Sequence, residues 1–170
     1  MTKRIVAAAL SAVLCFALAA CGSKPASSAS GPKDYAAAIT AARSDEDNEY
    51  QAILAKSTLT EEEASMAQMT LDVLGVTEDQ LDDYAISLSL INVRAYAVAV
   101  LKPAEGQAGA VQEGVEQFVK AQQQSFANYL QDQYEIAKAA KVSQLPSGEI
   151  VLVMCEDAAD VYSKIETALK

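Results

Sequence analysis

Histidine is absent from this sequence, and only three of its 170 residues are cysteine. Zinc sites draw mainly on histidine nitrogens and cysteine thiolates, so the chain lacks the usual ligands. Serine triads and cysteine dyads also need a histidine base. Gly106, Gly109 and Gly114 have no lysine and serine or threonine after them, as a phosphate-binding loop requires. We therefore expect no catalytic residue, no metal and no cofactor, and we predict that the protein is not an enzyme.

Basic residues are also scarce, with 13 lysines and arginines against 23 aspartates and glutamates and a net charge of −10. Such a surface repels nucleic-acid phosphates and anionic headgroups, so we predict no nucleic-acid partner. The acidic runs have structural explanations, because negative charge is favoured in the first turn of a helix and charged side chains are usually solvated. They comprise residues 45–47, 61–63 and 78–83.

One acidic run begins as a calcium-binding loop does, with acids at Asp45, Asp47 and Glu49. The sixth position of such a loop needs a glycine and the twelfth a bidentate glutamate, but Tyr50 and Lys56 stand there. We therefore predict no specific calcium site. Loose binding of divalent cations by the acidic surface stays an open alternative.

The first twenty residues have the pattern of a secretory signal peptide. Lys3 and Arg4 form a basic start, and residues 5–20 are almost wholly apolar. This run is shorter than the roughly 20 residues that a membrane-spanning helix needs. We interpret it as the apolar region of a cleaved signal and not as an anchor.

The four residues that end this region, Leu18-Ala19-Ala20-Cys21, resemble the lipobox of bacterial lipoproteins. The resemblance implies cleavage between Ala20 and Cys21 and lipidation of the Cys21 thiol as a diacylglyceryl cysteine, with palmitate among the acyl chains. Several acyl chains hold a protein stably on a membrane, whereas one holds it marginally. The alternative is an ordinary cleaved signal peptide in which the cysteine is incidental.

After Cys21, the segment Gly22–Lys33 is small and polar and contains two prolines, as a flexible tether does. About twelve such residues span on the order of 20 Å, which would keep the folded part close to the membrane. Losing Lys3 and Arg4 with the signal changes the net charge to −12. The predicted organisation is a lipoprotein signal peptide, a lipidated cysteine with a tether, and a single globular α+β domain, at 1–20, 21–33 and 34–170.

Only one free thiol is expected in the mature chain. Cys15 leaves with the signal and Cys21 is lipidated, so Cys155 has no intramolecular disulfide partner. Cys155 shares one face of a strand-like run with Val151 and Val153. Free cysteine is among the most buried residue types, so we predict a small buried hydrophobe.

The first half of the domain has helical patterns. Residues 34–43 predict a short helix, which residues 44–50 interrupt. Thr60 and Glu63 have the spacing of a capping box, and Gly75 stands in a helix-stop position. This pattern predicts a helix over residues 61–74.

Two hairpins are predicted from alternating apolar residues. Alternation from Tyr84 and again over residues 94–102 indicates two consecutive strands. Residues 140–145 and 149–155 flank the turn sequence Pro146-Ser147-Gly148, which is typical of a second hairpin.

Between and after the hairpins, apolar residues recur at helical spacing. The stripe from Val111 to Leu130 predicts a long helix, with a break around residues 132–140. Asp157 is predicted to cap a closing helix that ends near Leu169. The whole order predicts an α+β fold: an antiparallel sheet of about four strands with helices packed on one face, preceded by N-terminal helical segments.

Residues 74–169 carry "DDYAISLSLINVRAYAVAVLK", "YLQDQYEIAKAAKV" and "GEIVLVMCED". These motifs resemble an uncharacterised lipoprotein family of clostridial-type Gram-positive bacteria, the domain of unknown function DUF4358. The resemblance implies a cell-envelope protein and brings no catalytic residue with it. Tyr129 and Tyr134 lie beside amide side chains in this region, and we predict that their rings serve helix packing more than recognition.

We therefore expect a lipid-anchored extracytoplasmic module on the outer face of the cytoplasmic membrane. Membrane lipid is its partner through acylated Cys21, and a further envelope protein, of unknown identity, is its expected partner in interaction or accessory work. The alternative is a small-molecule binding lipoprotein, although about 135 residues is small for two lobes closing on a solute. A hydrolase that uses carboxylates alone is a third hypothesis, for which the sequence singles out no pair of acids.

Overall fold

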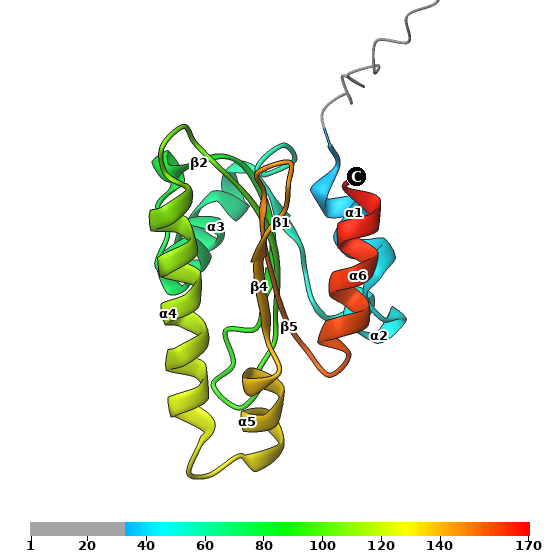
Figure 1. Cartoon of the computed structure of the whole chain (residues 1–170), viewed down its shortest axis with the longest axis vertical. Helices are drawn as coiled ribbons and strands as arrows, with labels where there is room; N and C mark the ends of the chain where they lie inside the picture. The colour runs from blue at the N-terminus through cyan, green and yellow to red at the C-terminus, as the bar shows by residue number, and fades with distance from the viewer. Residues whose placement is uncertain (1–32) are drawn as a thin grey trace, which may run out of the picture. The chain divides into compact units, whose positions relative to one another are not determined.

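The computed structural model describes residues 33–170, which form a five-stranded antiparallel sheet between two layers of helices (Figure 1). The α+β class and the antiparallel sheet are confirmed. The predicted signal peptide, the cleavage point between Ala20 and Cys21, the lipidation of Cys21 and the tether up to residue 32 lie outside the described residues. None of the helices in residues 33–170 has the length and apolar character needed to cross a membrane.

The sheet contains both predicted hairpins and one further strand. Its order is β1-β2-β3-β5-β4, and every neighbouring pair is antiparallel. The additional strand, β1, has two residues, too few for an alternating pattern to reveal it. The bounds are β1 Leu54–Ala55, β2 Leu81–Leu88, β3 Ala97–Pro103, β4 Lys141–Gln144 and β5 Ile150–Met154.

Helices cover both faces of the sheet, which differs from the expectation of one covered face. One face carries α3 (Glu61–Leu74), α4 (Ala108–Phe126) and α5 (Gln131–Lys138), and the other carries α1 (Tyr35–Ala42) and α6 (Ala158–Ala168). The physical reason lies in the central strands, because every residue of β5 is buried. A strand that is apolar on both faces must be covered on both.

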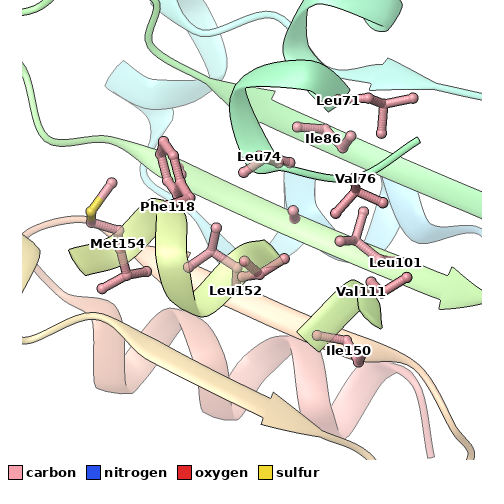
Figure 2. Close-up of a cluster of buried hydrophobic side chains, with 14 of the residues drawn as sticks. Leu71, Leu74, Val76, Ile86, Leu101, Val111, Phe118, Ile150, Leu152 and Met154 are labelled. Atoms are coloured by element: carbon pink, nitrogen blue, oxygen red, sulfur yellow. The ribbon is translucent and has the colours of Figure 1, made fainter. Parts of the chain in front are cut away.

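Alternate residues of the central strands enter two separate cores. Leu101, Ile150 and Leu152 pack with α3 and α4, as Figure 2 shows, whereas Val100 and Val151 face α1 and α6. The first core also receives Leu74 from the end of α3. The period of two along each strand therefore assigns its side chains to opposite layers.

The predicted boundaries of α3 agree with the structure. Thr60 and Glu63 form the reciprocal capping box, and Gly75 ends α3 in the left-handed conformation. Asp157 stands just before α6 as predicted, but its side chain makes no capping hydrogen bond. Two expected interruptions were wrong. Residues 45–50 form helix α2, and the break after α4 lies at residues 127–130 instead of 132–140.

The two ends of the sheet are distinct. At one end, which we call the Lys33 end, the described chain begins beside the turn between β4 and β5. At the other, the Cys155 end, lie the loop between β2 and β3 (residues 89–96) and the turn from β5 into α6. The eight residues of β2 span on the order of 25 Å, which sets the separation of the two ends.

Candidate functional site

A cleft of about 600 Å³ opens at the Cys155 end, and we call it the end cleft. Four segments meet around it: α2 (Asp45–Tyr50), the β2–β3 loop, α5, and the turn from β5 with the start of α6. Its lining combines aliphatic, acidic and amide side chains with one guanidinium. The residues that define it here are Glu46, Asp47, Ile91, Val93, Arg94, Tyr96, Gln133, Ile136, Cys155, Glu156, Asp157 and Val161.

Hydrogen bonds hold the β2–β3 loop against α5 and the residues before it. The Ala95 backbone N–H donates to Gln133 Oε1 at 2.8 Å, and the Tyr129 hydroxyl donates to the Asn92 carbonyl at 2.9 Å. The loop also closes on itself, because the Arg94 N–H donates to the Ile91 carbonyl at 3.2 Å. Polar contacts along its length thus determine its conformation.

The opposite side of the loop is held by charge. Arg94 Nη2 lies 3.0 Å from Asp47 Oδ1 on α2, and its guanidinium carbon lies 5.3 Å from the centre of the Tyr96 ring. Asp47 is only 15% exposed, so this pair is screened less than an ordinary surface pair. The contact connects α2 to the loop across the end cleft.

Although it is held on two sides, the loop presents apolar side chains to solvent. Ile91 is 64% exposed, Val93 53% and Leu90 46%. A short loop that only connected two strands would not need three aliphatic side chains in water within four residues. Their exposure on a hydrogen-bonded loop beside a cleft is typical of a binding surface.

Arg43 secures the region behind the end cleft. Its Nε donates to Asn48 Oδ1 at 2.6 Å and Nη2 to the Gln51 carbonyl at 2.7 Å. Nη1 donates to Ser87 Oγ at 2.7 Å and to the Tyr96 hydroxyl at 3.3 Å. This buried guanidinium therefore connects the end of α1 to α2, to β2 and to the β2–β3 loop. Burial raises the pKa of Tyr96, while the hydrogen bond from Arg43 acts in the opposite direction.

Sequence reasoning missed Arg43, because nothing in its local pattern distinguishes it from a solvated helix end. It is 8% exposed, and none of the ion pairs found among residues 33–170 includes it. A buried cation usually has a carboxylate partner, but here neutral oxygens from four residues satisfy it. Only the tertiary structure brings these oxygens together.

The acidic runs take different places in the fold. Residues 61–63 form the first turn of α3, where Thr60 holds the pKa of Glu63 below its ordinary value by hydrogen bonds from its backbone and its hydroxyl. Residues 78–80 form a single 3-10 turn, and residues 81–83 begin β2. Residues 45–47 form the first turn of α2, and two of them, Glu46 and Asp47, line the end cleft.

The three acids weighed as calcium ligands, Asp45, Asp47 and Glu49, lie in helix α2, so they do not wrap around a common point as loop ligands do. Within residues 33–170, no three acidic or thiol side chains gather closely enough to hold a metal ion.

Cys155 closes part of the cleft floor. The residue is 6% exposed, and burial raises the pKa of its thiol to about 11. The prediction of a small buried hydrophobe is confirmed. The thiol is protonated at neutral pH, which leaves it a poor nucleophile.

A second polar cluster lies at the Lys33 end around the buried carboxylate of Glu149. Lys33 Nζ lies 2.9 Å from Glu149 Oε1, and the Tyr35 hydroxyl donates to the same oxygen at 3.2 Å. The Ser147 hydroxyl donates to the other oxygen. Burial acts to raise the pKa of Glu149, but the hydrogen bonds from Ser147 and Lys33 outweigh it and hold that pKa below its ordinary value.

The two tyrosines noted in the sequence have different environments. Tyr134 is partly buried and packs against the first core, as predicted. Tyr129 is 58% exposed, although its ring centre lies 6.3 Å from that of Phe126. Its hydroxyl supports the β2–β3 loop, so Tyr129 contributes to the surface beside the end cleft.

The fold and the end cleft define an α+β protein with an open antiparallel sheet and a recessed surface at one end. Residues 55–156 match the family model of the domain of unknown function DUF4358, and the chain belongs to this family. No curated protein and no solved structure matches the chain. The matched region includes the β2–β3 loop, α5 and Glu156, whereas α2 and Arg43 precede it. The α2 wall of the end cleft, together with Asp157 and Val161, therefore lies outside the matched region.

Proposed function

We propose that this protein is a membrane-anchored extracytoplasmic lipoprotein whose domain is a non-enzymatic protein-interaction module of the cell envelope. The observation that carries the interaction role is the fixed β2–β3 loop with exposed Ile91 and Val93 beside the end cleft. The anchor follows from the sequence of residues 1–33, above all the lipobox at Cys21.

A preformed apolar loop suits recognition because little order has to be gained on binding. Contacts to Gln133, Tyr129 and Asp47 already restrict the loop in the free protein. A partner that covers Ile91 and Val93 gains about 25 cal/mol for each Å² of apolar surface removed from water. Since the loop is already ordered, less of this gain is lost to conformational entropy.

The position of the end cleft is compatible with an anchored protein. A tether of about twelve residues would hold the Lys33 end within on the order of 20 Å of the membrane. The Lys33–Glu149 pair fixes where such a tether leaves the domain. The end cleft opens at the opposite end of the sheet, so attachment at the Lys33 end would leave it accessible to other envelope proteins.

Site-specific photo-cross-linking in cells tests the interaction role. A photoreactive amino acid replaces Val93 in the full-length protein, and a matched probe replaces Met69, an exposed apolar residue on α3 (53% exposed). We expect a protein joined to the Val93 probe and absent from the Met69 probe. If both probes are folded and abundant in the envelope and neither captures a protein, the interaction role is refuted.

Replacing Cys21 by alanine tests the anchor separately. The variant should leave the membrane fraction, and the unmodified protein should carry a mass consistent with acylation at Cys21. A Cys21→Ala protein that is processed and still fractionates with the membrane would contradict lipid anchoring.

Small-molecule binding is the second candidate function, and the size of the end cleft favours it. Its volume of about 600 Å³ falls within the roughly 300–1,000 Å³ that is usual for ligand pockets. The single guanidinium that lines it, that of Arg94, is already engaged by Asp47. A solute screen that raises the Tm of the full-length protein would support this function, because a ligand of the native state stabilises that state.

A further inference from the structure

We propose that the end cleft recognises a basic segment of a partner protein, in which lysine or arginine side chains are flanked by apolar ones. This inference rests on the proposed interaction function and specifies the chemistry of the partner. Two features of the cleft that no sequence pattern revealed carry it: uncompensated negative charge on its rim and exposed aliphatic side chains on its fixed loop.

The charge of the cleft is strongly one-sided. Glu46, Glu156 and Asp157 line it and are exposed. None of the ion pairs between side chains of residues 33–170 involves any of them. Arg94 is the cation of the lining, and Asp47 already neutralises it. A cationic side chain entering the cleft would therefore meet carboxylates from α2 and from the β5–α6 turn that have no cation of their own.

Negative charge alone would not distinguish a peptide from any other cation. The apolar β2–β3 loop adds a preference for a partner that also carries apolar side chains. Ile91 and Val93 project from the β2–β3 loop with more than half of their surface exposed. Ile136, which is partly exposed, adds aliphatic surface to the lining. A segment with apolar residues next to its basic ones would cover this surface while its cations reach the carboxylates.

Other classes of ligand would not match both the negative charge and the apolar surface of the cleft. Anionic headgroups and nucleic acids would face repulsion from Glu46, Glu156 and Asp157. A divalent cation would leave Ile91 and Val93 in water, and no metal-binding group of three side chains forms within the described part of the chain. A basic and apolar peptide uses both the charge and the apolar surface.

The test combines the Val93 photoreactive probe in full-length protein with mass spectrometry of the partner peptide joined to it. We expect captured peptides with a net positive charge and apolar residues beside the basic ones. In the same background, Glu46→Gln, Glu156→Gln and Asp157→Asn together should lower the cross-linking yield about tenfold, since each rim charge contributes a modest factor.

A matched control removes the same charge elsewhere. Glu105→Gln, Glu113→Gln and Glu116→Gln change three exposed acids that do not line the cleft, and the yield should stay within about twofold of the parent. Glu156→Lys alone provides a second cleft variant with a single exposed substitution. A thermal melt of each variant confirms that it is folded.

Separate outcomes overturn this inference and the proposed function. Captured peptides without an excess of basic residues, or equal yields from the cleft and control variants, would overturn the basic partner while the interaction function stands. If the Val93 probe captures no protein, both are overturned. A synthetic copy of the captured peptide should also bind the full-length protein at least several-fold more weakly at high than at low salt, because screening weakens exposed charge pairs; unchanged affinity would count against the inference.

Discussion

Gly114 allows α4 to cross the C-terminal end of α3 at close range, and its replacement by alanine should destabilise the protein. A Cβ atom built at Gly114 would lie 2.3 Å from the Gly75 carbonyl oxygen and 3.0 Å from its carbonyl carbon. Ordinary contacts of a Cβ begin at 3.4 Å. The atoms that it meets belong to the backbone at the end of α3, so no side chain can turn aside to make room.

Two opposing terms determine the size of the effect. Alanine is favoured over glycine within a helix by up to about 1 kcal/mol. Making room for the methyl group requires α4 to move from α3 by about 1 Å, and overpacking of this kind costs typically about 1–3 kcal/mol or more. Because Val111, Val115 and Phe118 hold α4 in the core, we expect the cost to prevail. The net loss should be about 1–2 kcal/mol, or roughly 3–8 °C in Tm.

Gly109 provides the matched control on the same helix. A Cβ at Gly109 would meet nothing within 4 Å, and the residue is exposed. Gly109→Ala should therefore leave stability unchanged or raise it by about 0.5 kcal/mol. Thermal and urea unfolding, followed by circular dichroism in one buffer, would measure both variants. A Gly114→Ala protein as stable as Gly109→Ala would refute the argument from close helix contact.

Three further predictions concern buried polar groups. Arg43→Lys should lower stability by about 1–3 kcal/mol in urea unfolding, because an ammonium cannot replace hydrogen bonds from three guanidinium nitrogens; unchanged stability would contradict this. Glu149 has a pKa below its ordinary value in the fold, so its stabilisation is present above the unfolded-state pKa of about 4.5 and is lost as pH falls through the folded value. The Tm of the parent protein should consequently fall more steeply below pH 5 than that of Glu149→Gln, and parallel curves would argue against this linkage. Cys155, with a pKa of about 11, should resist a thiol reagent at pH 8 until urea unfolds the chain, as peptide-resolved mass spectrometry would show; rapid labelling of the folded protein would contradict its burial.

Much of the local structure was predictable from short patterns. The Thr60 and Glu63 capping box and Gly75 predicted α3 with the observed bounds, because both ends of that helix are determined by hydrogen bonds within a few residues. The hairpins β2–β3 and β4–β5 were predictable from alternation and from the turn at Pro146–Gly148. Prediction failed at residues 127–130, where no side-chain cap marks the boundary, and at α2, although Ser44 caps that helix.

The candidate site was not predictable in the same way. The sequence predicted buried Cys155 and identified the acidic run at residues 45–47, but it did not show that they lie around one cleft. Residues from α2, the β2–β3 loop, α5 and the β5–α6 turn are separated by tens of positions, and no periodic pattern relates such distant segments. The role of Arg43 was hidden for the same reason.

The sequence by itself determined the character of each segment: the acidic composition, the absence of histidine, and the helices and strands whose caps and periods are local. The proposal of a lipid anchor at Cys21 also comes from the sequence alone. Only the tertiary structure decided that helices cover both faces of the sheet and that Ile91 and Val93 stand exposed on a fixed loop beside unpaired acids. The physical reason is range. Caps, turns and periodicity act over a few residues, whereas layer packing and the convergence of charges depend on how distant segments share one core.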